Sequence, residues 1–427
     1  FDGRMSALPL AAEGRIEADL ADLADLAALM ALPPPDLPAG WGGGRVAVTG
    51  ALTLTAAQTL HLRGGVVTLD DRELRGDADL ALGGSRPRLV AQVATGPLVL
   101  AAGGDTGGAA GGAAAGWSDA PIDASALGAL DADIGFAAEA LRIGPLSLGA
   151  VNGQLVIDRA RAVLTLAEVA AYDGAMSGTL VANARDGLSV SADLAFRAVA
   201  LQPLLTDLAG ITRLSATGDL AVQVLGAGNS VAAILDRLSG SATVALGPGQ
   251  IAGLDLPALL ATLDPDRAGD AGATAFDSLS ASFLIERGQM VNDDLVLGGR
   301  LVTATGQGRI GLATRDIDYR LRPVALTGAD GTGGLGVPVR IAGPWSDPSV
   351  TLDLEGLARE RLEDEVQAAE EAARARAREL EDEARRKAAE ELGAAPGESL
   401  EDAAKRRLEE ELQRQIGNTL NELLGGN

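Results

Sequence analysis

Cysteine is missing from the sequence, and aromatic residues make up only 2% of it. Without cysteine the chain has no disulfide framework and no thiol chemistry. So few aromatic residues leave little material for the stacking platforms that bind single-stranded nucleic acids. A formal net charge of −24 also opposes nucleic-acid binding, because phosphates require a basic surface. The sequence therefore excludes a disulfide scaffold and disfavours nucleic acid as a partner.

Long apolar runs are missing as well, since no stretch approaches the roughly 18–20 residues of a membrane span. The chain begins at Phe1 rather than Met, so we expect a fragment or a processed product. Apolar residues nevertheless account for 47% of the chain, and there are 56 glycines. That composition opposes global disorder and suits many short strands and turns.

Residues for nucleophilic catalysis are scarce. His61 is the only histidine, so a Ser-His-Asp site would have to use it. It stands between Leu60 and Leu62 in a strand-like alternation, which favours a surface position on a strand. No G-x-S-x-G elbow occurs in the sequence. We therefore expect that the protein is not an enzyme.

Acidic residues form small groups without the spacing of a metal site. Asp264, Asp266 and Asp270 fail the EF-hand pattern, because alanine occupies its fifth and twelfth positions. The pair Asp70-Asp71 and the run Asn292-Asp293-Asp294 fit turns better than metal or acid–base sites. We therefore expect no metal and no cofactor.

Residues 275–326 have the clearest periodicity in the chain. Apolar side chains alternate there with polar or charged ones, and Gly288 and Gly298-Gly299 separate the runs. A period of two places alternate side chains on opposite faces of a sheet, so the stretch predicts an antiparallel meander with one apolar face. The residues predicted to share that face are Leu279, Phe283, Ile285, Leu295, Leu297, Ile317, Tyr319, Leu321, Val339 and Ile341.

Similar alternation recurs over residues 45–100 and 117–354, where Gly50, Gly64-Gly65 and Gly76 are expected to mark turns. About two dozen strands at ~4.8 Å spacing would make a sheet roughly 100 Å long. The predicted fold is mainly β: a long antiparallel, strongly curved sheet, groove-like or taco-like, with a few short amphipathic helices. A plain β-sandwich or β-solenoid is the alternative that periodicity leaves open.

Three short amphipathic helices are predicted within the sheet region. They cover residues 201–208, 230–238 and 254–263, and Ser230 is the expected N-cap of the second. Whether the predicted apolar face lines a groove or packs under these helices cannot be decided from the pattern.

The composition changes after Gly356, because 31 of the 72 residues in 356–427 are charged. This change predicts a long solvated helix to about Leu392 and a second helix that begins at a capping box of Ser399 and Asp402. We therefore predict four parts along the chain. The first is a β-groove segment at 1–103 with a helix near 19–31, and a Gly/Ala-rich flexible linker or insertion follows at 104–116. A β domain at 117–356 and a charged helical tail at 357–427 complete the chain.

Five further stretches, in order, carry a family resemblance. They read GWSDAPIDASALGALDADIGFAAEALRI, GPLSLGAVNGQLVIDRARAVLTLAEVAAYDGAMSGTLVANA, ALQPLLTDLAGITRLSATGDLAVQVLG, LSGSATVALGPGQIAGLDLPALL and VPVRIAGPWSDPSVTLDLEGL. Together with residues 275–326, their order resembles the C-terminal region of the AsmA family over roughly 240 residues. Residues 1–103 look like the preceding part of such a protein, and the tail after Gly356 lies outside the family core.

The resemblance implies a bacterial cell-envelope protein of the AsmA/TamB-type repeating β-groove superfamily. Such a protein is held in the inner membrane by an N-terminal helix, which this chain lacks, and it projects into the periplasm. The implied function is to hold phospholipid acyl chains in an apolar β-groove, in support of lipid transport and outer-membrane biogenesis. The apolar face at residues 279–341 then becomes the expected lipid-contacting surface, and the resemblance supplies no catalytic residues.

The partners implied are phospholipid, membranes through the missing anchor, and outer-membrane assembly proteins. An alternative function is that of a non-enzymatic scaffold, which would assist outer-membrane protein assembly through its surface and its helical tail. The tail can equally be an inert spacer.

Overall fold

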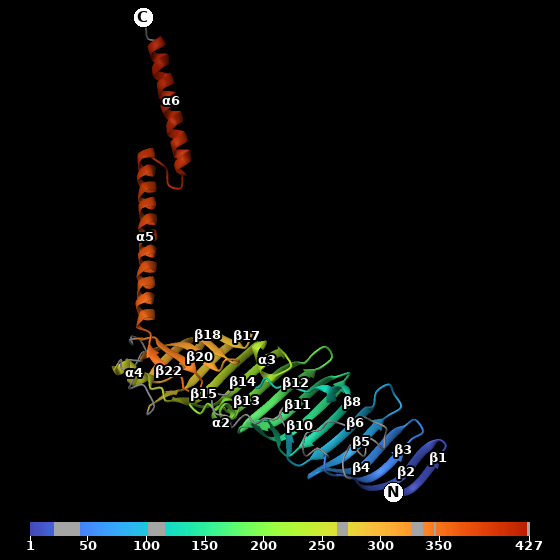
Figure 1. Cartoon of the computed structure of the whole chain (residues 1–427). Coiled ribbons are helices and arrows are strands. Elements are labelled where there is room, and N and C mark those ends of the chain that lie inside the picture. Colours follow the sequence, from blue (N-terminus) through green and yellow to red (C-terminus); the bar gives the residue numbers. More distant parts are fainter. Residues whose placement is uncertain (21–42, 101–115, 263–271, 326–335, 346, 425–427) are drawn as a thin grey trace. The chain divides into compact units, whose positions relative to one another are not determined.

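The computed structural model describes residues 1–20, 43–100, 116–262, 272–325, 336–345 and 347–424. The chain divides into a sheet unit, Phe1–Asp353, and a helical unit, Leu354–Asn427. All strands of the sheet unit belong to one open sheet of 22 strands (Figure 1). The prediction of a mainly β fold built on one long sheet is therefore confirmed.

The first part of the sheet is a meander in chain order, in which each strand pairs antiparallel with the next as far as β6. Its strands are β1 (Asp2–Ala7), β2 (Leu10–Leu20), β3 (Val46–Leu54), β4 (Thr59–Leu69), β5 (Arg72–Ala81), β6 (Arg88–Thr95) and β7 (Leu98–Leu100).

The second part joins the first through parallel pairings of β6 with β8 and of β7 with β9. The expected sheet was purely antiparallel, but β8 and β9 run in the same direction as β6 and β7, so the sheet is mixed. The strands of this part are β8 (Asp131–Ala138), β9 (Leu141–Ile143), β10 (Leu146–Asp158), β11 (Arg161–Ala171), β12 (Gly174–Asn183), β13 (Ser189–Ala200), β14 (Leu214–Ala227), β15 (Ser239–Ala252), β16 (Ala273–Phe276), β17 (Ser278–Glu286), β18 (Gln289–Gly298), β19 (Val302–Gly311), β20 (Asp316–Ala325), β21 (Val339–Pro344) and β22 (Ser349–Leu352).

The three predicted short helices are present as α2 (Leu201–Ala209), α3 (Val231–Asp236) and α4 (Leu256–Thr262). The Ser230 hydroxyl accepts a hydrogen bond from the backbone N–H of Ala233 at 3.2 Å, which confirms the predicted N-cap. Figure 1 shows α2 and α3 at opposite long edges of the sheet. Each helix replaces a tight turn between consecutive strands.

Three expectations fall wholly or partly outside the described residues. Of the helix expected near 19–31, Asp19 and Leu20 lie in β2, and residues 21–31 are not described. The strand alternation of β2 continues through those two positions, so the helical start was wrong. Most of the linker 104–116 and the acidic segment 264–270 also lie outside the described residues.

Several glycines expected in turns lie inside strands. Gly50 and Gly64-Gly65 mark register shifts in β3 and β4, and Gly76 lies in the middle of β5. Gly76 has a φ of +156°, and a Cβ there would collide with the carbonyl oxygen of Gln92. Glycine at these positions bends a long strand instead of ending it, because only glycine adopts that backbone conformation at low cost.

The run Asn292-Asp293-Asp294 is also not a turn, because it forms a bulge within β18. Asn292 is buried; its Nδ2 donates to the carbonyl oxygen of Ser282 at 2.7 Å, and its Oδ1 accepts from the Tyr319 hydroxyl. The bulge gives buried polar groups partners that regular strand pairing would not supply. Asp70-Asp71 does form the predicted turn, between β4 and β5.

The helical unit consists of α5 (Leu354–Leu392) and α6 (Leu400–Leu424), which matches the predicted long helix and its end. The backbone N–H of Asp402 donates to the Ser399 hydroxyl at 3.1 Å, and that hydroxyl donates to the Asp402 carboxylate at 2.7 Å. Ser399 is therefore the N-cap of α6, as predicted, and Asp402 contacts its hydroxyl instead of the backbone N–H that a full capping box would use.

Candidate functional site

One face of the sheet is apolar without interruption across most of its strands. Direct cross-strand partners share a face, so the pairings can be followed from strand to strand. Starting at Leu52, the successive partners are Leu62, Ala78, Ala91, Ile134, Leu155, Leu164, Leu180, Ala192, Val224, Gly240, Ile285, Met290, Ile310 and Ile317. We call this row the central lane; at ~4.8 Å per strand it follows the sheet for about 70 Å.

The opposite face of the same strands is polar. Thr165 and Thr179 follow Leu164 and precede Leu180, and they are themselves cross-strand partners. On the next strands Gln223 donates through its side-chain amide to the Asp193 carboxylate at 3.2 Å. The sheet is therefore amphipathic, so its apolar face needs a cover or a ligand.

One end of the apolar face is covered by helix α4. Leu256 and Leu259 of α4 have no exposed surface, and they pack in one cluster with Tyr319, Leu321 and Val339. The Thr274 hydroxyl accepts from the backbone N–H of Leu256 at 3.0 Å, which fixes the start of the helix. We call the face of β17–β22 the covered region.

Helix α2 forms a second cluster on the same face. Leu201 and Leu204 pack with Val199, Leu246 and Leu297, all of which are buried. The Tyr172 hydroxyl donates to the Asp207 carboxylate of α2 at 2.8 Å. Burial, with help from that carboxylate, raises the pKa of Tyr172 to about 12, so the hydroxyl stays protonated and keeps donating.

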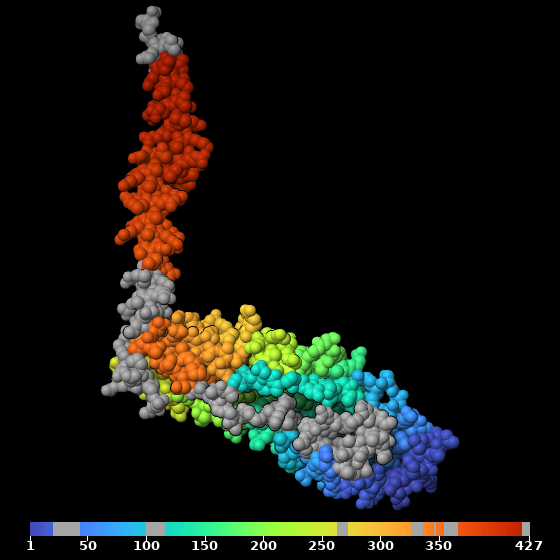
Figure 2. Space-filling model, in the orientation of Figure 1, coloured from blue at the N-terminus to red at the C-terminus, as the bar shows by residue number. Residues whose placement is uncertain are grey.

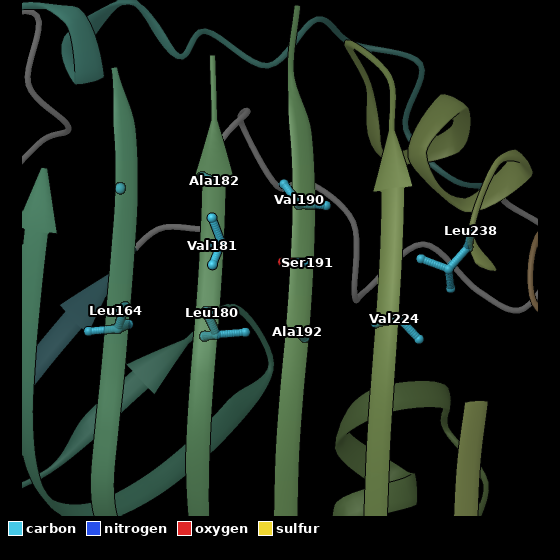
Figure 3. Close-up of a pocket in the computed structure, with 10 residues that line it drawn as sticks. Leu164, Leu180, Val181, Ala182, Val190, Ser191, Ala192, Val224 and Leu238 are labelled. Atoms are coloured by element: carbon cyan, nitrogen blue, oxygen red, sulfur yellow. The ribbon is translucent and has the colours of Figure 1, made fainter. Parts of the chain in front are cut away.

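The apolar face of β11–β14 carries a cavity of about 370 Å³ instead of a helix. Its walls include Ala162, Leu164, Leu180, Val190, Val224 and Leu238. Figure 3 shows the side chains of Leu164, Leu180 and Val224 on neighbouring strands, with Leu238 beside them. In the space-filling view a hollow exposes the green strands of this part of the sheet (Figure 2). We call the part of this face that lines the cavity the open region.

A second hollow, of about 560 Å³, lies on the polar side of the sheet. It is lined by Arg75, Gln92, Gln154 and Thr165, among others. Because its polar walls are mostly exposed, it lacks the apolar enclosure of the cavity in the open region.

The ten residues predicted to form one apolar face do lie on that face, but mostly where it is covered. Lipid contact by these residues stays a prediction. Two of them, Leu279 and Leu297, belong to the α2 cluster, and three, Tyr319, Leu321 and Val339, belong to the α4 cluster. Three more pack at the margins of these clusters: Leu295, Ile317 and Ile341. Of the remaining two, Ile285 is buried on the central lane and Phe283 is half-buried.

Sequence reasoning missed the cavity residues. Leu164, Leu180 and Val224 show the same alternation with polar neighbours as residues 275–326 do. That signal could have placed them on the apolar face, but nothing in it distinguishes a half-buried leucine in a cavity from a buried one under a helix.

His61 is on strand β4, as predicted, and its Nδ1 lies 2.7 Å from an Asp79 carboxylate oxygen. Arg63 pairs with the same carboxylate at 2.6 Å. The Arg63 guanidinium, with a smaller effect of His61, holds the pKa of Asp79 below its usual range. This group is an ion pair across two strands, in which one carboxylate is shared by two cationic or polar partners.

Within the described ranges, no three His, Cys, Asp or Glu side chains gather as a metal site would require. None of the helices in those ranges combines the length and apolarity needed to cross a bilayer.

Residues 106–295 match the model of the AsmA family. This match is consistent with an AsmA-family protein. The AsmA region contains the open region and its cavity, and it ends within β18. AsmA is a family of the bacterial cell envelope. Neither curated proteins nor solved structures gave a match to the chain.

Proposed function

We propose that this protein holds the acyl chains of phospholipids on its apolar face and carries them along the sheet. The observation that supports this most is the central lane, an unbroken apolar row that leads into a cavity with apolar walls. In keeping with the family, the role is one in the cell envelope, in lipid transport. We further propose that the protein lies in the periplasm, is anchored to the inner membrane and contributes to outer-membrane assembly.

The physical reason is the cost of moving an acyl chain through water. Each methylene transferred from water to an apolar surface contributes about 0.8 kcal/mol, so a chain of about 16 carbons faces a barrier on the order of 10 kcal/mol. A continuous apolar row lowers that barrier at every step, while the polar head group stays in water. Small and branched side chains suit this task, because bulky aromatic residues would fill the face.

The proposal includes no enzymatic step. His61 and Arg63 both pair with the Asp79 carboxylate, in a cross-strand ion pair that supports the sheet. The apolar cavity offers binding surface without polar groups to stabilise a transition state.

The test is native mass spectrometry, with lipid extraction, of the full chain purified from a bacterial host. We expect bound phospholipid in the wild-type protein. The double variant Leu164→Glu with Leu180→Glu places two charges in the cavity wall and should lose the lipid. The matched control is Thr165→Glu with Thr179→Glu, which changes the same two strands on the polar face and should retain it.

Two outcomes would contradict the proposal. One is a stable wild-type protein without lipid, and the other is equal lipid in both double variants. Circular dichroism on each variant separates loss of lipid from loss of fold.

One observation favours the second candidate, a scaffold for outer-membrane protein assembly. Leu408, Leu412, Ile416 and Leu420 repeat every four residues on one side of α6, and each is about half exposed or more. Deletion of residues 354–427 distinguishes the candidates: a groove keeps its lipid without the helical unit, whereas a scaffold loses its protein partner in a pull-down.

A further inference from the structure

One long edge of the sheet is formed by the connections between strands on the side of α3, and we call it the α3 rim. Neighbouring connections of this rim are tied together by backbone hydrogen bonds of 2.7–3.0 Å, whose donors are the N–H groups of Ala184, Gly228, Gly288 and Leu312. The acceptor for Gly288 is the carbonyl oxygen of Leu238, a residue that also lines the cavity. The α3 rim therefore borders the cavity of the open region.

One segment, residues 117–130, runs along the α3 rim and leads into β8; we call it the strap. At its start the indole N–H of Trp117 donates to the carbonyl oxygen of Leu312 at 2.7 Å. At its end the Arg86 guanidinium donates to the carbonyl oxygen of Gly128 at 2.7 Å. Leu312 lies between β19 and β20, and Arg86 lies between β5 and β6, so the strap reaches across the strands between these two connections.

In its middle the strap is bound to α3 and to the turn before it. The N–H of Ala232 donates to the carbonyl oxygen of Ser118 at 3.1 Å, and the N–H of Ile122 donates to that of Asn229 at 2.7 Å. Ala232 lies in the first turn of α3, where an N–H has no partner within the helix, so this donor depends on the strap. In the space-filling view, turquoise atoms of the strap border the hollow (Figure 2).

The strap has little slack. Nine strand pairings separate β8 from β19, which is on the order of 40 Å along the sheet at ~4.8 Å per pairing. A fully extended chain from Trp117 to Asp131 spans at most about 50 Å, and the 3₁₀ turn Ser125–Gly128 shortens that reach. The strap therefore resists any opening of the rim, because its backbone cannot lengthen to follow.

The two ends of the strap are held in different ways. Its last residues continue into β8, which pairs with β6 and β10 along its length. Its start is held through the Trp117 side chain, by the hydrogen bond to Leu312 and by the Arg315 guanidinium, which lies 3.9 Å from the centre of the indole. Two such contacts break more easily than the pairing of a whole strand. We call them the Trp117 latch.

We propose that the strap controls the passage of acyl chains over the α3 rim into the cavity, and that it opens at the Trp117 latch. The proposal rests on the proposed function and adds the control of access to the cavity. With the latch closed, Ser118 and Ile122 hold α3 and the Leu238 that follows it at the cavity wall. With the latch open, this part of the rim is free to move, so a lipid enters and leaves faster while the cavity walls stay the same.

The test measures the rate of lipid exchange as well as the amount bound. The full chain, loaded with phosphatidylcholine, is mixed with vesicles of deuterated phosphatidylcholine, and native mass spectrometry follows the replacement of one lipid by the other. Trp117→Ala removes both latch contacts, so it should raise the exchange rate about tenfold and leave the bound amount unchanged. Trp117→Phe keeps a ring beside Arg315 but has no donor, so its rate should lie between the two.

Hydrogen exchange without lipid tests the latch by itself. The amides of Ile122 and Ala232 bond between the strap and the α3 segment, so Trp117→Ala should weaken their protection. The matched control is Trp345→Ala, because the Trp345 indole N–H donates to the carbonyl oxygen of Asp316 at 3.0 Å, next to the same β19–β20 connection. This control should change neither the two amides nor the rate of lipid exchange.

The two measurements separate the possible outcomes. Weaker amide protection without faster lipid exchange makes the strap a structural brace and overturns the control of access. Unchanged amides in Trp117→Ala, or an equal rise in lipid exchange in Trp345→Ala, contradict the latch. If Trp117→Ala does not fold, Trp117→Phe decides by the same two measurements. A wild-type protein that binds no lipid contradicts the proposed function itself, while the amides still show whether Trp117 holds the strap.

Discussion

The covered region and the open region are built from the same strand alternation, yet they bury their apolar residues differently. Val339 is 0% exposed and Leu321 7% exposed, because α4 lies over them. Leu164 and Leu180 in the open region are only half-buried and face a cavity. The difference is a second layer of structure: α4 completes a core over the covered region, whereas no residue of a described helix lines the cavity of the open region.

This comparison shows where the molecule has stability and where it has capacity to bind. Burial under a helix yields packing energy but leaves no room for a ligand. The open region lacks that packing energy, but its exposed apolar surface is available to an acyl chain. The same kind of substitution should therefore have opposite consequences in the two regions.

The largest effect is expected for Leu259→Ala in the covered region. Leu259 is fully buried, and its loss leaves a cavity under α4 that should cost about 3 kcal/mol. Hydrogen exchange should report this as weaker protection of the amides of β20 and β21, which lie under α4. Bound lipid per folded molecule should stay unchanged.

The matched control is Leu180→Ala in the open region. Leu180 is half-buried, so its truncation should cost less than about 1 kcal/mol, while the bound lipid decreases. An equal loss of stability in both variants would contradict the proposed difference between the two regions, because it would show that the open region is packed like the covered one.

Gly240→Ala should have the next largest effect. Gly240 lies on the central lane in β15, between the two regions, with a φ of +147°, and a Cβ there would collide with the carbonyl oxygen of Gln223. Backbone strain of this kind costs about 1–3 kcal/mol, so the melting temperature should fall by several degrees. Gly128→Ala is the control, because its Cβ meets no atom; similar melting temperatures would show that the bend at Gly240 is not required.

Much of the fold could be read from the sequence because its signals are local. Period-two alternation located the meander of β17–β20, and capping residues such as Ser230 and Ser399 located helix starts. The parallel junction of β6 and β8 was not predicted, because alternation within a strand carries no information about the direction of its neighbour. A glycine such as Gly76 was misread as a turn, because turns and strand bends require the same backbone freedom.

The candidate site could be predicted only in part. The alternation identified an apolar face, but the contrast between Leu321 and Leu180 depends on where α4 packs. That packing is a tertiary event between segments far apart in the chain, and no local pattern encodes it.

Tyr319→Phe tests the polar contact inside the covered region. The Tyr319 hydroxyl donates to Asn292, and both residues are buried. Removing the hydroxyl leaves the Asn292 carbonyl oxygen without this donor, at a cost of about 1–2 kcal/mol. The decrease should be visible in thermal unfolding. Unchanged stability would mean that the bulge in β18 holds Asn292 without help from Tyr319.

The smallest effect is a pH dependence at Tyr172, at the edge of α2. Its pKa is raised from 10.0 to about 12 by burial and by the Asp207 carboxylate that accepts its hydrogen bond. The raised pKa adds stability that is complete below pH 10 and is lost as the pH rises towards 12. The melting temperature of the wild type should therefore exceed that of Tyr172→Phe at neutral pH, and the difference should decrease as the pH rises from 10 towards 12. Tyr319 is present in both proteins, so its titration does not affect the difference between their melting temperatures. A difference that stays constant with pH would show that the Tyr172 hydroxyl makes no pH-dependent contribution to the attachment of α2.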